Sequence, residues 1–151
     1  WYRWYLCCTY LRAAVILAET QGSFIQYLNE QKIASSQCVT CGALYLPPKP
    51  ICSSCTRNEM TTEILSGEGV ILGLTSISIV PSAMLQKGYG RQKPYATGVI
   101  RLKEGVSIGA FIELPSTNKP IEDYVGVPVT ATFRTDDQEE SRMILTFQII
   151  Q

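Results

Sequence analysis

The chain has 151 residues, 46% of them hydrophobic, which is enough for one compact core or for two small units. Its 13 basic and 13 acidic residues balance, so no global electrostatic field favours a polyanion such as DNA. The sequence contains no histidine, which excludes a Ser-His-Asp triad or a Cys-His dyad built from this chain alone.

Residues 1–18 are aromatic and apolar. A membrane-spanning helix needs about 20 apolar residues, and Arg3 and Arg12 leave an uncharged run that is too short. A signal peptide is an alternative, although no convincing small-residue cleavage site follows. We expect a helix that packs on this protein or on a partner. Cys7 and Cys8 are adjacent in it and are expected to be free thiols.

A second helix is predicted to begin at Ser23. Ser23 and Gln26 match a capping box, in which each side chain accepts a hydrogen bond from the other residue's backbone N–H. Apolar residues then recur on one face at helical spacing, at Phe24, Tyr27 and Leu28. The helix is expected to fade near residues 34–36, so that residues 1–35 form an N-terminal helical segment.

Two Cys-x-x-Cys pairs follow, separated by ten residues, at Cys38, Cys41, Cys52 and Cys55. Zinc prefers four soft ligands in a tetrahedron, and a site closed by four thiolates is structural because no position is left for water or substrate. Gly42 follows the first pair, where the chain must turn without a side chain in the way. The pattern predicts a zinc ribbon at residues 36–60, with iron in a rubredoxin-like site as the open alternative.

The same pairs indicate a compartment. Cysteines spaced for a metal in a chain without a clear secretory signal favour reducing conditions over a disulfide framework. We therefore expect a cytoplasmic protein.

Residues 61–151 change character, because helical spacing gives way to alternation with many β-branched residues. Alternation predicts half-buried strands, here at Gly69–Ile79, Tyr95–Leu102, 106–114, 127–133 and 143–149. Residues 103–105 form a predicted hairpin turn, in which Gly105 can take a positive φ. The remaining connections are expected to be a loop, a short helix and a polar hairpin loop, at 115–120, 121–125 and 136–141.

Five strands with a long connection between the first and the second suit a small closed barrel. Closure removes the exposed edges that a flat sheet would leave. We therefore predict a mainly β chain, in which the helical segment and the ribbon precede a five-stranded OB-fold barrel at residues 61–151.

Two segments are more specific than the pattern of elements. One is residues 36–55, SQCVTCGALYLPPKPICSSC, and the other is residues 93–106, KPYATGVIRLKEGV. Together they resemble the acyl-CoA-associated OB-fold family with an N-terminal rubredoxin-like zinc ribbon, over about residues 23–151. Residues 1–18 have no counterpart in this resemblance.

The resemblance implies a role. Members of this family are usually small partners of thiolases, ketoacyl synthase-like enzymes or enoyl-CoA hydratases, without catalytic residues of their own. The resemblance therefore implies that this chain is a non-catalytic accessory subunit of a hetero-oligomer, most simply a thiolase-type acyltransferase complex. In that complex it would support assembly and form part of a CoA or acyl-CoA site. A hydratase partner is the alternative to a thiolase.

The charge distribution agrees with a CoA site. Residues 86–103 contain five basic residues and no acidic one. Cations can meet the phosphates of CoA and aromatic rings its adenine, so the candidate residues are Lys87, Tyr89, Arg91 and Lys93. An ordinary solvated loop explains the same residues, and both interpretations stay open.

Two other functions are considered. Zinc ribbons and OB barrels also bind single-stranded nucleic acid in other proteins, although the neutral charge argues against that here. A free-standing enzyme would have to use carboxylate or lysine chemistry, and we find no paired acids at the mouth of a predicted pocket.

Overall fold

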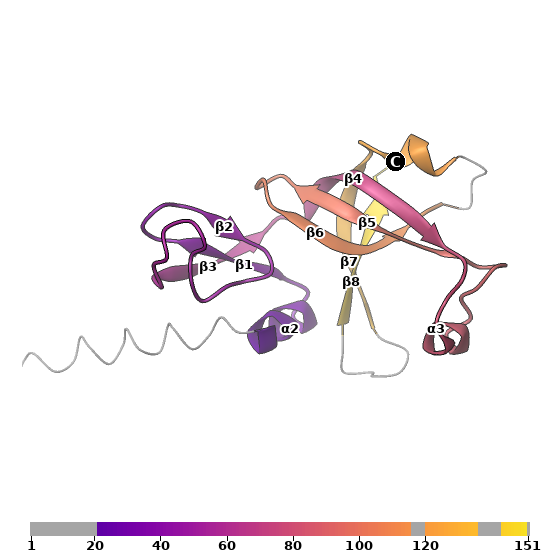
Figure 1. Ribbon diagram of the computed structural model, residues 1–151, viewed down its shortest axis with the longest axis horizontal. Coiled ribbons are helices and arrows are strands. Elements are labelled where there is room, and N and C mark those ends of the chain that lie inside the picture. The colour runs from indigo at the N-terminus through magenta and orange to yellow at the C-terminus, as the bar shows by residue number, and fades with distance from the viewer. Residues whose placement is uncertain (1–20, 116–119, 136–142, 151) are drawn as a thin grey trace, which may run out of the picture. The chain divides into compact units, whose positions relative to one another are not determined.

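The computed structural model describes residues 21–115, 120–135 and 143–150 (Figure 1). The predictions for residues 1–18, including Cys7 and Cys8, and for the loop at 136–141 lie outside these ranges, as does most of the loop at 115–120. The chain divides after Leu65 into two compact units, and each is described by itself.

The first unit contains a helix and a small sheet. The helix α2 spans Gln21–Asn29, and the antiparallel sheet has the order β2-β1-β3. Its strands are β1 (Ile33–Cys38), β2 (Leu44–Tyr45) and β3 (Met60–Leu65). Residues 61–65, expected in the barrel, therefore pair with the ribbon strand β1.

The predicted helix end near residues 34–36 is wrong, because this segment is the buried strand β1. The helix ends earlier, where Gln31 takes a φ of 58° and Lys32 N–H donates to the Tyr27 carbonyl at 2.9 Å. Ser35 and Ser36 are fully buried. Ser35 Oγ donates to the Glu63 carbonyl at 2.9 Å, and Ser36 Oγ accepts from the Lys49 N–H at 2.8 Å, so partners distant in sequence make these serines tolerable in a strand interior.

The second unit is a closed barrel with the strand order β4-β5-β6-β8-β7, which confirms the mainly β prediction. Among the strands that the structure describes, β6 and β8 form the one parallel pair, and this pairing closes the barrel. The strands are β4 (Glu68–Ile77), β5 (Tyr95–Leu102), β6 (Ser107–Glu113), β7 (Pro128–Thr135) and β8 (Met143–Ile149). The short helices α3 (Ser82–Gln86) and η1 (Ile121–Tyr124) lie in its connections.

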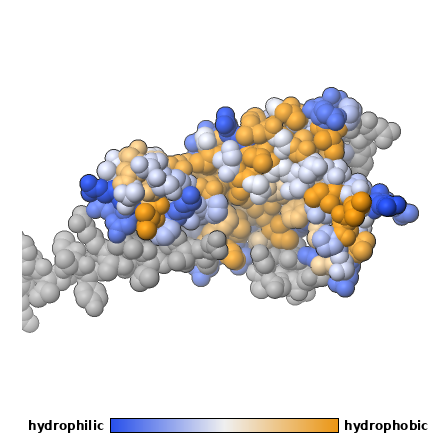
Figure 2. All heavy atoms as spheres, in the orientation of Figure 1, coloured by the Kyte–Doolittle hydropathy of each residue, from blue (hydrophilic) through white to orange (hydrophobic). Residues whose placement is uncertain are grey.

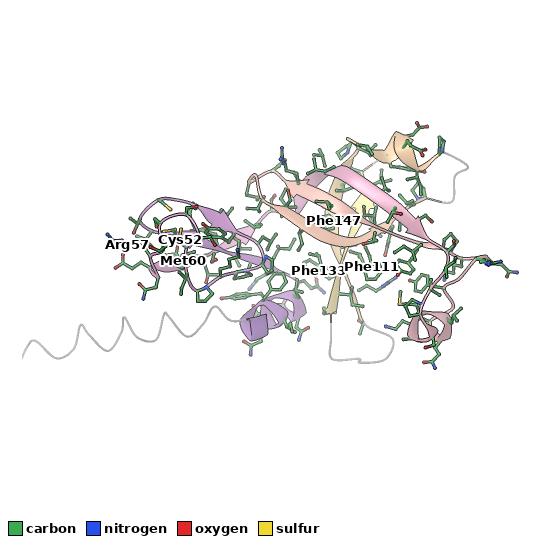
Figure 3. All side chains as sticks on the ribbon, viewed as in Figure 1. Cys52, Arg57, Met60, Phe111, Phe133 and Phe147 are labelled. Atoms are coloured by element: carbon green, nitrogen blue, oxygen red, sulfur yellow. The ribbon has the colours of Figure 1, made fainter. Side chains whose placement is uncertain are left out.

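Alternating side chains fill the barrel. The largest fully buried apolar ones in this unit are Ile71, Ile100, Leu102, Val129 and Phe147, and Phe147 lies among the strands in Figure 3. The predicted hairpin turn is confirmed, since β5 and β6 are antiparallel and Gly105 has a φ of 89°. A Cβ at Gly98 would lie 2.4 Å from the Gly73 carbonyl oxygen, so this position requires glycine where β4 and β5 meet.

Apolar residues also reach the surface of the barrel. Val70, Leu72 and Val99 are exposed on the paired strands β4 and β5, and Figure 2 shows hydrophobic surface over this unit. Among the described residues, no helix has the length and apolar character needed to cross a membrane.

Candidate metal centre and ligand cavity

Four thiols converge in the first unit. The sulfur atoms of Cys38, Cys41, Cys52 and Cys55 all lie within 4.8 Å of one another. The Sγ atoms of Cys38 and Cys55 are 3.6 Å apart, and those of Cys41 and Cys52 are 3.5 Å apart. A tetrahedral zinc with Zn–S bonds of about 2.3 Å requires sulfurs about 3.8 Å apart, so the set fits zinc.

Two similar backbone turns supply these thiols. Gly42 N–H donates to the Cys38 carbonyl at 2.8 Å, and Thr56 N–H donates to the Cys52 carbonyl at 2.9 Å. Gly42 has a φ of 72° and Thr56 a φ of 59°. The sequence indicated the first turn through its glycine. The second places a β-branched residue in a left-handed conformation, which is uncommon and which no local pattern predicts.

Hydrogen bonds favour the ionised form of the two buried thiols. The backbone N–H groups of Cys41 and Thr40 lower the pKa of Cys38, although burial opposes them. The hydroxyl of Tyr45 lowers the pKa of Cys52 to about 6, with help from backbone N–H groups of the same turn. Both sulfurs are therefore prepared to act as thiolates, the form that binds metal.

The other two thiols are shifted the opposite way. A backbone N–H lowers the pKa of Cys55, but burial and the three neighbouring thiols outweigh it and raise that pKa to about 12. The Ala43 N–H lowers the pKa of Cys41, yet the thiol of Cys52, burial and the thiol of Cys38 raise it overall. Four thiolates this close repel one another unless a cation lies between them. A divalent metal at the centre of the four sulfurs would offset this repulsion.

Tyr45 is the residue of this centre that sequence reasoning missed. It lies on β2, and its Oη is 3.3 Å from the Sγ of Cys52. It also packs against the small core formed by Cys38, Cys52 and Met60, and Figure 3 shows the last two residues together in this unit. A tyrosine between two cysteine pairs carries no signal of its own, because only the hairpin brings its hydroxyl to the sulfur.

A cavity of about 400 Å³ lies on the second unit, lined by residues of all five strands and of the loop before β5. Three aromatic rings follow one another along it, with centroids 5.4 Å apart for Tyr89 and Tyr95 and 5.4 Å apart for Tyr95 and Phe111. Two cations accompany them. Lys93 Nζ lies 5.5 Å from the Tyr89 ring centroid, and Arg134 Nη1 donates to Tyr89 Oη at 3.3 Å.

The structure brings together part of the predicted CoA set. Tyr89 and Lys93 line the cavity, whereas Lys87 and Arg91 are not among its lining residues. Arg134 is an addition that the sequence did not indicate, because it stands just before an acidic segment and reaches the cavity only through the barrel topology. The cavity thus offers aromatic surface beside positive charge, a combination that suits a planar anionic ligand.

The comparisons with known proteins agree with the fold. A family model described as the ChsH2 rubredoxin-like zinc ribbon domain matches residues 26–60, and one described as the ChsH2 C-terminal OB-fold domain matches residues 63–134. These matches confirm the resemblance inferred from the sequence, and with it the zinc ribbon and the OB-fold.

One relative and two solved structures extend this finding. A DUF35 domain-containing scaffold protein from Methanocaldococcus jannaschii is 31% identical over 113 residues, which are 74% of this chain and 74% of the relative. The structure named Ltp2-ChsH2(DUF35) aldolase matches with a TM-score of 0.70 at 18% identity, over 85% of this chain and 92% of that one. A DUF35 protein of unknown function from Sulfolobus solfataricus matches with a TM-score of 0.58 at 18% identity, over 94% and 98%.

Proposed function

The chain belongs to the DUF35 family, and from that membership we propose that it is a non-catalytic accessory subunit of an acyl-CoA-processing enzyme, with a thiolase as its partner. The observation that carries the proposal is the 31% identity to a relative described as a scaffold protein. A structural neighbour supports it, because its name joins a DUF35 protein to an aldolase. An accessory role also suits a chain without histidine.

In this proposal the four cysteines hold a structural zinc. The metal cross-links the two turns and keeps the ribbon rigid, so that the ribbon can serve as a docking element. Four thiolates leave no open coordination position, so the metal takes no part in chemistry. Retention of these thiols in reduced form is consistent with a cytoplasmic protein.

The barrel supplies the binding surfaces. Exposed Val70, Leu72 and Val99 support contact with another protein, since apolar side chains on paired strands are stabilised by a partner's surface. The cavity between Tyr89 and Arg134 is proposed to border the CoA site. Lys87, Arg91 and Lys93 would meet phosphates, while Tyr89 would contact the adenine ring.

The first experiment isolates the tagged full chain from its native extract and identifies stoichiometric partners by mass spectrometry. A thiolase is the expected partner. An enoyl-CoA hydratase would replace the thiolase in the proposal, and recovery of the chain alone would contradict an accessory role.

A second experiment measures CoA binding to the purified complex by calorimetry. The variant Lys93→Ala/Arg134→Ala should weaken CoA binding without dissociating the complex, and so should Lys87→Ala/Arg91→Ala/Lys93→Ala. The control Lys32→Ala/Arg57→Ala removes one lysine and one arginine from the first unit and should leave the affinity unchanged. If the wild type and all variants bound CoA with equal affinity, residues 86–94 would be an ordinary solvated loop without a role in CoA binding.

Single-stranded nucleic acid is the second candidate ligand, and one observation favours it. The cavity includes Tyr95 and Phe111 on the second and third strands of the barrel, the region with which OB-folds bind oligonucleotides. Binding of a labelled oligonucleotide that weakens steeply with salt would support this function over the CoA site.

A further inference from the structure

The hydroxyl of Tyr45 has three polar neighbours. Its Oη lies 3.3 Å from Cys52 Sγ, 3.0 Å from Ser54 Oγ and 3.1 Å from the Ser54 backbone nitrogen. All three neighbours belong to the turn that supplies Cys52 and Cys55. A side chain on β2 is therefore attached to the second metal-binding turn.

The chemistry of these groups fixes the direction of each hydrogen bond when metal is bound. A metal-bound thiolate has no proton and can only accept, so Tyr45 must donate its single proton to Cys52. The Tyr45 oxygen then accepts from both the Ser54 N–H and the Ser54 hydroxyl. The phenol oxygen gives one hydrogen bond and receives two, which satisfies all of its capacity.

The position of Tyr45 is fixed from the other side as well. The strand pairing places Tyr45 opposite Ser36, whose Oγ accepts from the Lys49 N–H at 2.8 Å. The Lys49 ammonium lies 5.1 Å from the Tyr45 ring centroid. Donors and a cation on the phenol polarise its O–H toward the sulfur, because hydrogen bonds in a chain strengthen one another.

The two metal-binding turns differ in whether a side-chain hydroxyl lies against one of their sulfurs. Among the described residues, Cys52 is the ligand candidate with a side-chain hydroxyl against its sulfur, whereas the side-chain contacts given for the other three sulfurs are with cysteine sulfurs of the same cluster. The cysteines also differ in exposure to solvent, since Cys52 is fully buried and Cys41 is exposed. The backbone of the two turns is alike, so the asymmetry comes from side chains.

We propose that Tyr45 is a positioning residue of the metal centre, whose hydroxyl donates to the zinc-bound thiolate of Cys52 and holds that sulfur on the metal, so that the centre opens first at Cys41. This inference rests on the proposed zinc ligation by the four cysteines. It is independent of the proposed partner and of CoA.

The first test compares zinc affinity by chelator competition in the full-length wild-type chain and in Tyr45→Phe. The variant keeps the ring and loses only the hydroxyl. Loss of a hydrogen-bond partner of a metal ligand typically weakens affinity by about 10- to 100-fold, and we expect a change in that range. Tyr27→Phe, which removes a hydroxyl from α2 in the same unit, is the matched control and should bind zinc like the wild type.

A spectroscopic readout separates hydrogen bonding from packing. In the Co²⁺-substituted protein, the thiolate-to-metal charge-transfer band should move to lower energy in Tyr45→Phe, because the lost hydrogen bond no longer stabilises the sulfur lone pairs. Ser54→Ala keeps the backbone donor and removes the hydroxyl, so its band should move the same way by less. Weaker zinc binding with an unmoved band would show a packing role only and overturn the proposal.

The order of opening is tested by limited alkylation of the zinc-loaded chain, with each cysteine located by peptide mass spectrometry. In the wild type, Cys41 should be modified first and Cys52 last of the four. In Tyr45→Phe, Cys52 should be modified earlier. An unchanged order and affinity would overturn the role of Tyr45, whereas a wild-type chain without zinc would overturn the ligation on which it rests.

Discussion

The two units of this chain maintain their order by different means. The ribbon has a small core in which Cys38 and Cys52 are themselves buried members, next to Met60. The barrel buries larger apolar side chains, such as Phe147, inside a closed ring of strands. A metal cross-link can thus stabilise a segment that, like the ribbon, is too short to enclose a large apolar core. Changes to the metal should therefore affect one unit and changes to packing the other.

The largest effect is expected from loss of the metal. Structural zinc contributes an apparent binding free energy of about 10–16 kcal/mol in zinc-finger peptides, so chelation or Cys52→Ser should unfold the ribbon. Amide hydrogen exchange should show lost protection in β1 and β3 and retained protection in β4–β8. Ser53→Ala, next to the ligand in sequence, is the control that should keep its metal. Simultaneous loss of protection in the barrel would contradict the comparison.

The second prediction perturbs the barrel and leaves the ribbon unchanged, by removing a large buried side chain. Phe147→Ala should destabilise this unit by about 3–5 kcal/mol, the usual cost of such a truncation in a core. Chemical denaturation would measure the loss, with Phe147→Leu as the milder control. The Co²⁺ spectrum of the ribbon should not change, and a change in it would show that the two units do not respond separately.

A smaller effect is expected where β4 and β5 approach. In Gly98→Ala the added Cβ would lie 2.4 Å from the Gly73 carbonyl oxygen and 2.8 Å from Ile112 Cδ1, and overpacking of this kind costs about 1–3 kcal/mol. Gly73→Ala is the matched control on the neighbouring strand, because a Cβ there meets nothing within 4 Å. Equal melting temperatures for the two variants would contradict this account of Gly98.

The smallest effect concerns the turn after β5. Burial tends to raise the pKa of Glu104, but the Ser66 N–H, which donates to its Oε1 at 2.7 Å, and further polar contacts lower it overall. A lowered folded-state pKa stabilises the protein above the ordinary value near 4.5, and this contribution disappears as pH falls through the folded pKa. Because the group is largely exposed, Glu104→Gln should cost less than about 1 kcal/mol at neutral pH.

The pH dependence provides the check on Glu104. The difference in unfolding free energy between wild type and Glu104→Gln should be constant near neutrality and shrink in acid. Glu122→Gln, the same charge change on η1, controls for general electrostatics. If the difference instead grew in acid, the pKa of Glu104 would be raised on folding, which would contradict a stabilising hydrogen bond from the Ser66 N–H to its carboxylate.

Much of the architecture could be predicted from local patterns. The strand Tyr95–Leu102 was predicted with its observed bounds, because alternation and the following turn are both local signals. The convergence of four sulfurs followed from spacing, since each pair lies within one turn. Ser35 and Ser36 misled the prediction, because small polar residues suggest a helix end and their burial depends on partners elsewhere in the chain.

The site residues that sequence reasoning missed share a cause. Tyr45 acts on Cys52 across a hairpin, and Arg134 meets Tyr89 from a strand far along the chain. Tyr45 lies between the two cysteine pairs without being part of the Cys-x-x-Cys pattern, and Arg134 lies outside both segments that carry the resemblance. Both gain their roles from which segments lie side by side, and that information exists only once the sheet and the barrel have formed.

The parallel pairing of β6 with β8 has a consequence for synthesis. This pairing joins Phe111–Glu113 to Thr146–Gln148, so the barrel cannot close until β8 has left the ribosome. The three strands of the ribbon are complete at Leu65. We therefore expect the ribbon to capture its metal on the nascent chain, while the open edges of β6 and β7 wait for the last strand and are the segments most in need of a chaperone.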